Sequence, residues 1–251
     1  MRESADADGA TMTLIDHLRE LRGRLVKASI ALVVGMIVMY VLYVPIFRFA
    51  SKPYCAAIKG TSQRHCDLYF HGLLDGFLLR LQVAGYLGFV IALPIIAWQL
   101  WRFIAPGLYK KEKRYAVAFV ASSTFLFACG AVLAYLTLPP MFQWLIQSGG
   151  PGLYQNRADD YFHLLAIMIL AFGFSFEFPL LLVVLQIVGI VQTDVLRKYR
   201  RHAFVGIVVV VAVVTPGGDP VSLIALSLPL YFFYEIAIVF GRVLARPRAK
   251  E

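Results

Sequence analysis

The chain has 251 residues, of which 60% are hydrophobic and only 16% charged, and its mean hydropathy is +0.72. Soluble domains carry fewer apolar and more charged residues, so these proportions exclude a single soluble core and predict an integral membrane protein. The net charge of +9 does not indicate nucleic-acid binding, because the bases form short clusters between apolar runs without interleaved aromatic residues.

Six apolar segments are predicted, in chain order: 25–47, 78–103, 115–138, 161–191, 203–215 and 221–241. A membrane helix needs about 20 residues, and segment 203–215 would reach only about 20 Å of the ~30 Å hydrocarbon core. Either this hairpin dips into the bilayer without crossing it, or it crosses and the bilayer thins around it, which we favour. We therefore predict an all-α membrane protein, with one domain over 1–251 and six transmembrane helices, of which the last two are short.

The Lys and Arg residues predict the orientation of these segments. Eighteen of them lie at the N-terminus, in the loops after the second and fourth segments, and in the C-terminal tail, whereas six lie on the opposite side. Because cytoplasmic loops concentrate Lys and Arg, both termini are expected in the cytoplasm. The first 24 residues are polar and too acidic for a cleavable signal sequence, so no removable leader is expected.

Catalytic and metal-binding motifs are missing from the sequence. It contains no HExxH, GxSxG or P-loop pattern, and its five histidines show no ligand spacing. The stretch PGGD (216–219) superficially resembles the GxGD of intramembrane aspartyl proteases, but Pro216 stands where that motif has glycine. We expect neither enzymatic activity nor a metal or other cofactor.

Two acids lie within apolar segments. Glu177, in FGFSFEFPLL, is near the middle of segment 161–191, where an ionised carboxylate costs about 2.5–3.5 kcal/mol. Its carboxyl group must therefore face the protein interior or a wet cavity, or stay protonated. Its role is either structural, with a hydrogen bond from a neighbouring hydroxyl or backbone group, or functional. Glu235 is closer to the cytoplasmic interface and is expected to pair with Arg242 or another base.

Two further acids each stand among bases on the cytoplasmic side. Glu20 lies in HLRELRGRL (17–25), whose leucines recur at helical spacing and predict an interfacial helix. Glu112 lies in APGLYKKEKR (105–114), surrounded by three lysines and an arginine. By itself, this pattern is also consistent with simple charge balance.

Several stretches together resemble one family, the TatC proteins of the twin-arginine translocase. They are HLRELRGRL (17–25), SKP (51–53), WRFIAPGLYKKEKR (101–114), FGFSFEFP (172–179), TPGGDPVS (215–222) and LPLYFFYEIAI (228–238), and they span almost the whole chain in order. The resemblance implies a multi-pass protein of a bacterial cytoplasmic membrane that binds twin-arginine signal peptides and the single-span subunits TatA and TatB. It also implies a homo-oligomer within that complex, and no nucleic-acid partner.

The resemblance also assigns residues. It implies that Glu20 and Glu112 read the arginine pair, and it places five further residues in the same motifs as part of the signal-peptide site: Arg22, Arg24, Phe103, Pro106 and Leu108. For partner docking and transport it points to Pro53, Glu177, Thr215, Asp219 and, less firmly, Glu235. The family pattern often has glutamine after the serine of TPGGDPVS, whereas this chain has Leu223.

Two alternatives to this function remain open from the residues. A secondary transporter of small solutes could use Glu177, although the paired repeats typical of transporters are not visible. An intramembrane enzyme is opposed by the missing motifs. The transporter would show solute uptake that depends on Glu177. The enzyme would show catalysis by the purified chain.

Cys55 and Cys66 both lie in the first loop predicted to face outward, where disulfides can form. A disulfide between them would contribute about 2–3 kcal/mol in the chain-entropy model. The alternative is two free, buried thiols. Cys129, within an apolar segment, is expected to remain reduced.

Overall fold

The computed structural model describes residues 14–58, 66, 68–104, 113–149, 157–215 and 218–245. Across these residues the chain forms helices and no strand, as expected for an all-α protein. The helices are α1 (Leu14–Val41), α2 (Tyr43–Ala50), α3 (Lys52–Ile58), α4 (Asp75–Ile104), α5 (Lys113–Ser148), α6 (Ala158–Val188), α7 (Thr193–Lys198), α8 (Arg200–Val214) and α9 (Pro220–Ala245).

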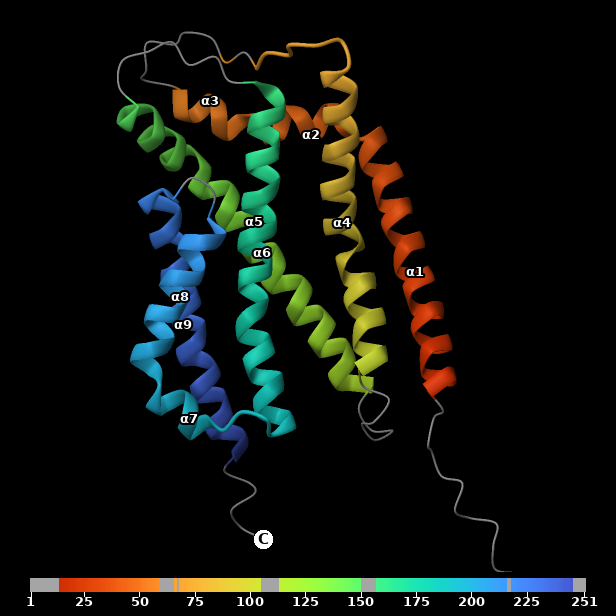
Figure 1. Ribbon diagram of the computed structural model, residues 1–251, viewed down its shortest axis with the longest axis vertical. Coiled ribbons are helices and arrows are strands. Elements are labelled where there is room, and N and C mark those ends of the chain that lie inside the picture. The colour runs from red at the N-terminus through yellow and green to blue at the C-terminus, as the bar shows by residue number, and fades with distance from the viewer. Residues whose placement is uncertain are drawn as a thin grey trace, which may run out of the picture.

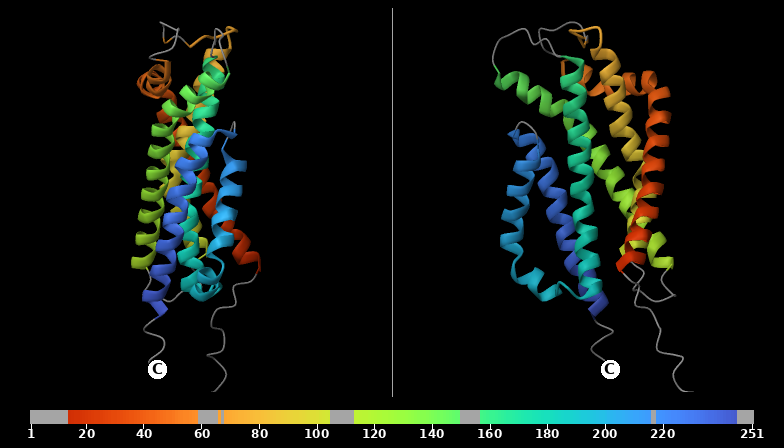
Figure 2. Two further views of the ribbon diagram at one scale, coloured as in Figure 1. Left: turned by 90° about the vertical axis from the view of Figure 1, so that its left-hand side faces the viewer. Right: turned by 45° about the vertical axis from the view of Figure 1, so that its right-hand side comes forward.

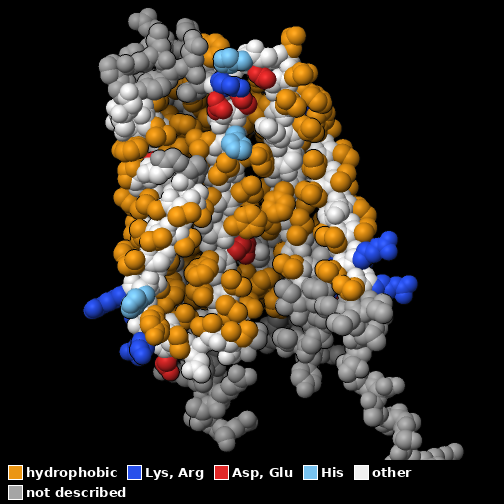
Figure 3. Space-filling model, in the orientation of Figure 1, with side chains coloured by type: hydrophobic (Ala, Val, Ile, Leu, Met, Phe, Trp, Pro, Cys, Tyr) orange, Lys and Arg blue, Asp and Glu red, His pale blue; other side chains and the backbone are white. Residues whose placement is uncertain are grey.

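The long helices run along one axis, and the short ones lie across its two ends (Figure 1). α1 begins at the lower end, where α4 and α6 finish and α7 lies, and α2 and α3 cover the upper end (Figures 1 and 2). α5 starts beside the end of α4 and crosses obliquely towards the upper end above α8 and α9. Most of the visible surface between the ends is apolar (Figure 3), as a lipid-facing wall requires.

Five of the described helices are long and apolar enough to cross a membrane: Leu18–Val41, Asp75–Arg102, Val117–Ser148, Ala158–Ile187 and Pro220–Arg242. α8, with 15 residues, is the fifth of the six predicted segments, and at about 22 Å it remains shorter than the hydrocarbon core. The short fifth helix is therefore present, whereas its full crossing of the bilayer remains a prediction.

The prediction of one helix over 25–47 was wrong at its end. α1 begins as early as Leu14 and ends at Val41. After Leu42, a separate helix, α2, lies across the upper end. The break coincides with Arg80 of α4, whose Nε and Nη2 donate to the Tyr40 carbonyl oxygen at 3.1 and 2.9 Å. The guanidinium also stacks 4.1 Å from the centre of the Tyr40 ring. Arg80 thus satisfies a carbonyl at the end of α1 that lacks a helical partner.

Other boundaries differ for local reasons. The stretch SKP (51–53) lies at the start of α3, where Pro53 is tolerated because the first turn has no helical acceptor for its missing N–H. α5 continues through Pro139 and Pro140 to Ser148, beyond the predicted end at 138. α4 begins at Asp75, before the predicted start at 78, and the Asp75 carboxylate accepts the N–H groups of His71 and Gly72 in the turn that precedes the helix.

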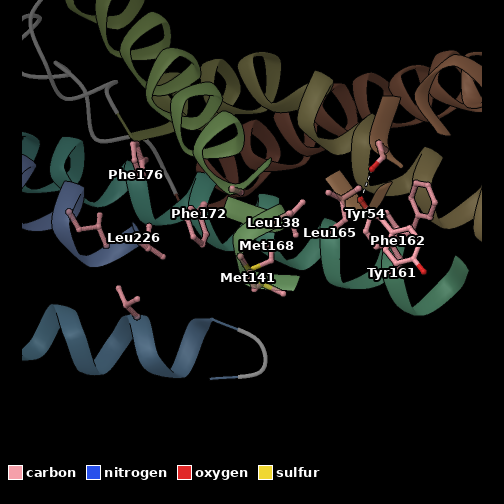
Figure 4. Packing of buried hydrophobic residues seen from close by; sticks show 14 of the residues in the cluster. Tyr54, Leu138, Met141, Tyr161, Phe162, Leu165, Met168, Phe172, Phe176 and Leu226 are labelled. Atoms are coloured by element: carbon pink, nitrogen blue, oxygen red, sulfur yellow. Dashed lines mark hydrogen bonds between the residues drawn. The ribbon is translucent and has the colours of Figure 1, made fainter. Parts of the chain in front are cut away.

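The helices meet around a core centred on α6. Figure 4 shows Phe172 and Phe176 of α6 beside Leu226 of α9, and Met168 beside Leu138 and Met141 of α5. Two tyrosines fix α2 over this core, since the hydroxyls of Tyr135 and Tyr161 donate to the carbonyls of Phe49 and Ala50 at 2.8 and 2.5 Å. The last turn of α2 is therefore held by α5 and α6.

Candidate functional site

The start of α1 carries the predicted acid Glu20 at the lower end. Glu20 is bound to Arg24 one turn later: Arg24 Nε donates to Glu20 Oε1 at 3.1 Å, and Arg24 Nη2 bonds the same oxygen. The predicted interfacial helix is thus continuous with α1, and its leucines, Leu18, Leu21 and Leu25, face outward. The polar pair, not the leucine stripe, is the more shielded part of this segment.

The second half of the predicted peptide site falls on the connection between α4 and α5. Pro106, Leu108 and Glu112 lie outside the described residues, and Phe103 belongs to the last turn of α4 without a described side chain. The residues on either side of this connection, Ile104 and Lys113, lie at the same end of the molecule as the start of α1 (Figure 1). Arg22 is an exposed residue of α1 in the same region.

Glu177 lies within α6, about 16 Å from its lower end. Its Oε1 accepts a hydrogen bond of 2.9 Å from the hydroxyl of Ser123, a buried residue of α5. Ser123 thus provides the neighbouring hydroxyl that was expected as one way to satisfy this acid. A serine within an apolar segment was the sequence signal for this partner, and Ser123 was not among the predicted site residues.

A cleft of about 560 Å³ opens between α6, α8 and α9, and some of its lining residues are sequence neighbours of Glu177. Its walls are apolar except for Ser175 and Tyr234, and they include Phe174, Phe178, Gly206 and Val210. Glu177 is not among the lining residues, because its carboxylate is directed to α5. The Glu177 carboxylate is therefore directed away from this cleft.

Thr215 and Asp219 close the two ends of the turn between α8 and α9, and both are buried. The Thr215 hydroxyl donates to the Val211 carbonyl at 2.8 Å, in the last turn of α8. Asp219 Oδ1 accepts the Ser222 N–H at 2.7 Å, so Asp219 caps α9, with Pro220 as its first helical residue. Both side chains therefore hydrogen-bond within the turn and are shielded from its surface.

Glu235 binds a base other than Arg242. Its Oε2 lies 2.9 Å from Arg200 Nη2 at the start of α8, and its Oε1 accepts the Tyr231 hydroxyl at 3.2 Å. The next residue back, Tyr234, donates its hydroxyl to the Leu196 carbonyl of α7 at 2.8 Å. Glu235 and Tyr234 thus join α9 to the α7–α8 segment near the lower end.

One polar cluster had not been anticipated. Gln186 of α6 donates to the Ala237 carbonyl of α9 at 3.2 Å and accepts the Thr193 hydroxyl of α7 at 3.1 Å. Gly241 leaves the necessary room, since a Cβ there would collide with the Gln186 side chain. The sequence signal was a glutamine close to the end of an otherwise apolar segment.

Pro53 and the predicted cysteine pair lie at the upper end. Pro53 is buried in α3, and Cys55 of the same helix forms a disulfide with Cys66, with Cα atoms 5.3 Å apart. Cys129 of α5 is a free thiol. Pro53, Glu177 and Glu20 therefore lie at three different levels of the bundle and do not form one site.

Comparison with known proteins gives concordant results. The family model described as Sec-independent protein translocase protein (TatC) matches residues 16–229. The Sec-independent protein translocase protein TatC of Frankia casuarinae is 40% identical over 248 residues, which cover 96% of this chain and 68% of that protein. The protein of the same name from Deinococcus radiodurans is 36% identical over 93% of this chain and 87% of its own length.

A solved structure is similar as well. The crystal structure of the twin-arginine translocase receptor TatC in DDM superposes with a TM-score of 0.72 at 31% identity. The match covers 90% of this chain and 99% of that one. The similarity therefore extends over most of this chain and almost all of that structure.

Proposed function

The chain belongs to the TatC family of Sec-independent protein translocase proteins, and we propose that its lower end receives twin-arginine signal peptides. The family makes it a multi-pass inner-membrane subunit of the twin-arginine translocase and not an enzyme. The alternative of a small-solute transporter that uses Glu177 has no support from the relatives. The observation that carries the proposal is that the Glu20 carboxylate already binds a guanidinium at this end.

Carboxylates at the lower end can recognise the arginine side chains of a signal peptide. A planar guanidinium can bind a carboxylate through two parallel hydrogen bonds, which a lysine ammonium cannot do. Such a charge-assisted bond contributes about 1.5–3 kcal/mol when shielded, against 0–1 kcal/mol for an exposed pair. Glu20 and Glu112 would each take one arginine, with Arg22, Phe103, Pro106 and Leu108 in the same motifs around them.

The lower end would be cytoplasmic, with both termini on that side. Lys and Arg gather there, in the first turns of α1, at the ends of α4 and α9, and in α7 and the start of α8. Figure 3 shows several of these side chains projecting at the lower edge of the apolar surface. The positive-inside rule favours this orientation.

TatA and TatB would dock on α8 and α9. α9 exposes an apolar stripe at helical spacing, formed by Ile224, Leu228, Phe232, Ile236 and Val239. Thr215 and Asp219 would contribute indirectly, by holding the turn that sets the angle between the two helices. Leu223 packs against the core, so a polar contact from this position is not expected. Further copies of the chain would join the same assembly.

Crosslinking to a twin-arginine peptide tests the receptor role in membranes that contain this chain. We expect labelling by the twin-arginine peptide and much weaker labelling by a twin-lysine control. Glu20→Lys and Glu112→Lys should abolish labelling, whereas Asp194→Lys, which reverses an exposed acid of α7 at the same end, should not. Equal labelling by both peptides, or unchanged labelling of Glu112→Lys, would contradict the proposal.

A further inference from the structure

The cleft between α6, α8 and α9 has the width of a single hydrocarbon chain. Its volume is about 560 Å³, and on α8 its lining runs from Ala203 to Val214, a length of about 16 Å. The mean cross-section is therefore about 35 Å², less than half that of a helix, which with its side chains is about 10 Å across. A transmembrane helix is too wide for this cleft, whereas an unbranched acyl chain is narrower and can enter it.

The walls of the cleft suit an apolar occupant. Phe174 of α6 and Val210 of α8 line it and are 52% and 58% exposed. The hydroxyl of Tyr234, one of the two polar residues in the lining, already donates to the Leu196 carbonyl. Gly206 also lines the cleft, and a Cβ placed on it would meet no atom within 4 Å. An acyl chain would therefore bind by burying apolar surface, without a competing polar contact.

A basic segment lies at the lower mouth of the cleft, where α8 begins. The Ala203 N–H donates to the Tyr199 carbonyl at 2.9 Å, so Tyr199 lies one helical turn below the first lining residue of α8. The Lys198 ammonium lies 5.7 Å from the centre of the Tyr199 ring. Arg197, Lys198 and Arg201 are exposed, and none of them forms an ion pair with a described residue. Figure 3 shows Lys and Arg side chains at this lower left edge.

The nearby acids leave this segment positively charged. Glu235 is already bound to Arg200 at 2.9 Å, and Asp194 is the one acid in the sequence from 193 to 201. Clusters of Lys and Arg directly beyond a membrane helix attract anionic headgroups, and a tyrosine beside them suits the boundary between lipid and water. The mouth therefore matches the charge of an anionic headgroup, and the cleft above it matches the chain.

We propose that the cleft binds one acyl chain of an anionic phospholipid from the leaflet at the lower end, with Lys198 holding its headgroup and Arg197 next to it. The lipid would fill the space between α6 and α8. It would leave the apolar stripe of α9 free for TatA and TatB, because none of the stripe residues lines the cleft. The site goes beyond signal-peptide recognition and does not depend on it.

The headgroup is tested with the full chain in phosphatidylcholine nanodiscs. These contain a trace of phosphatidylglycerol or phosphatidylcholine with a photoreactive group in one acyl chain, and the labelled peptides are identified by mass spectrometry. We expect phosphatidylglycerol to label the cleft walls of α6 and α8 at least about fivefold more than phosphatidylcholine. Lys198→Gln should lower this preference about fivefold. Arg19→Gln, which removes a charge from an exposed residue of α1 at the same end, should leave it unchanged.

The acyl-chain site is tested with bulky substitutions in α8. Gly206→Phe fills the cleft and should lower labelling of its walls by both lipids at least about tenfold, because both carry the same chain. Val209→Phe adds the same ring to an exposed residue outside the lining and should not change the labelling. If Gly206→Phe does not insert, Gly206→Leu replaces it and should lower labelling by a smaller factor. Unchanged labelling of the inserted variant would overturn the proposal.

Two results with the parent chain would also overturn the proposal. Equal labelling of the cleft walls by both lipids would mean that the cleft takes any lipid chain and has no headgroup site. Absence of label from the walls would mean that no lipid chain enters, and would leave the cleft to another occupant such as a partner protein. Twin-arginine crosslinking is a separate measurement, so failure of this proposal and failure of the receptor role are distinguishable.

Discussion

Ser123 of α5 and Glu177 of α6 meet inside the bundle, where the serine hydroxyl donates a hydrogen bond of 2.9 Å to Glu177 Oε1. The two residues are 54 positions apart in the chain, so only the packing of α5 on α6 brings them together. This contact gives the acid a polar partner at a depth where an unpaired charge would be costly.

Substitution of Glu177 should separate export from peptide binding. Glu177→Gln keeps an acceptor for Ser123 and should largely preserve export, whereas Glu177→Leu should impair export and leave twin-arginine binding intact. Export of a folded reporter and peptide crosslinking would be measured on the same membranes. Ser123→Ala is the control: a defect as large as that of Glu177→Leu would mean that only the internal hydrogen bond matters. Full export by Glu177→Leu would leave Glu177 with a structural role alone.

The crossing of α1 and α4 should depend on Gly88. A Cβ on Gly88 would lie 2.6 Å from the Met36 backbone nitrogen, and one on Gly35 would lie 2.6 Å from the Gly88 carbonyl oxygen. Gly88→Ala should therefore destabilise the folded protein by about 1–3 kcal/mol, because the two backbones must separate. Gly85→Ala, one turn earlier, meets only the Met36 Cε at 4.0 Å and should be neutral or slightly stabilising. Thermal unfolding in detergent compares the two; equal stabilities would refute a close backbone contact.

Removal of the α9 cap should destabilise the α8–α9 hairpin. Asp219→Ala loses the acceptor for the Ser222 N–H and should cost about 1 kcal/mol, in a range of about 0.5–2 kcal/mol. Asp219→Asn keeps a side-chain oxygen and should cost less. Chemical denaturation of the two variants, with Asp194→Ala as an exposed-acid control, measures the difference. A loss as large for asparagine as for alanine would indicate that the charge of Asp219 matters more than its capping bond.

The Cys55–Cys66 disulfide should be detectable in protein isolated without reductant. Alkylation should then modify Cys129 alone once the protein is unfolded, and all three cysteines only after reduction. Cys55→Ser and Cys66→Ser should each lower stability by about 2–3 kcal/mol, since either one removes the same crosslink. Quantitative alkylation of Cys55 and Cys66 before reduction would show two free thiols.

The number and order of the apolar segments could be predicted from the sequence, because hydrophobic content over about 20 residues is a local property. The same holds for the short fifth helix, which begins and ends next to polar turns. The end of α1 was missed because residues 42–47 are as apolar as those before them, although Pro45, which lies in the first turn of α2, is a local signal for a helix boundary. It coincides with Arg80, 40 residues away from the Tyr40 carbonyl that it binds.

The sequence by itself determined that this protein lies in a membrane, which family it resembles and which acids stand among bases. It could not determine the partner of each charged group, because hydrogen bonds and ion pairs depend on distances across helices. The tertiary structure decided that Glu235 binds Arg200 of α8 and that Thr215 and Asp219 are buried in a turn. At the start of α1, it decided that Glu20 and Arg24 pair one helical turn apart and are more shielded than the leucines beside them, whereas Arg19 and Arg22 of the same helix remain exposed.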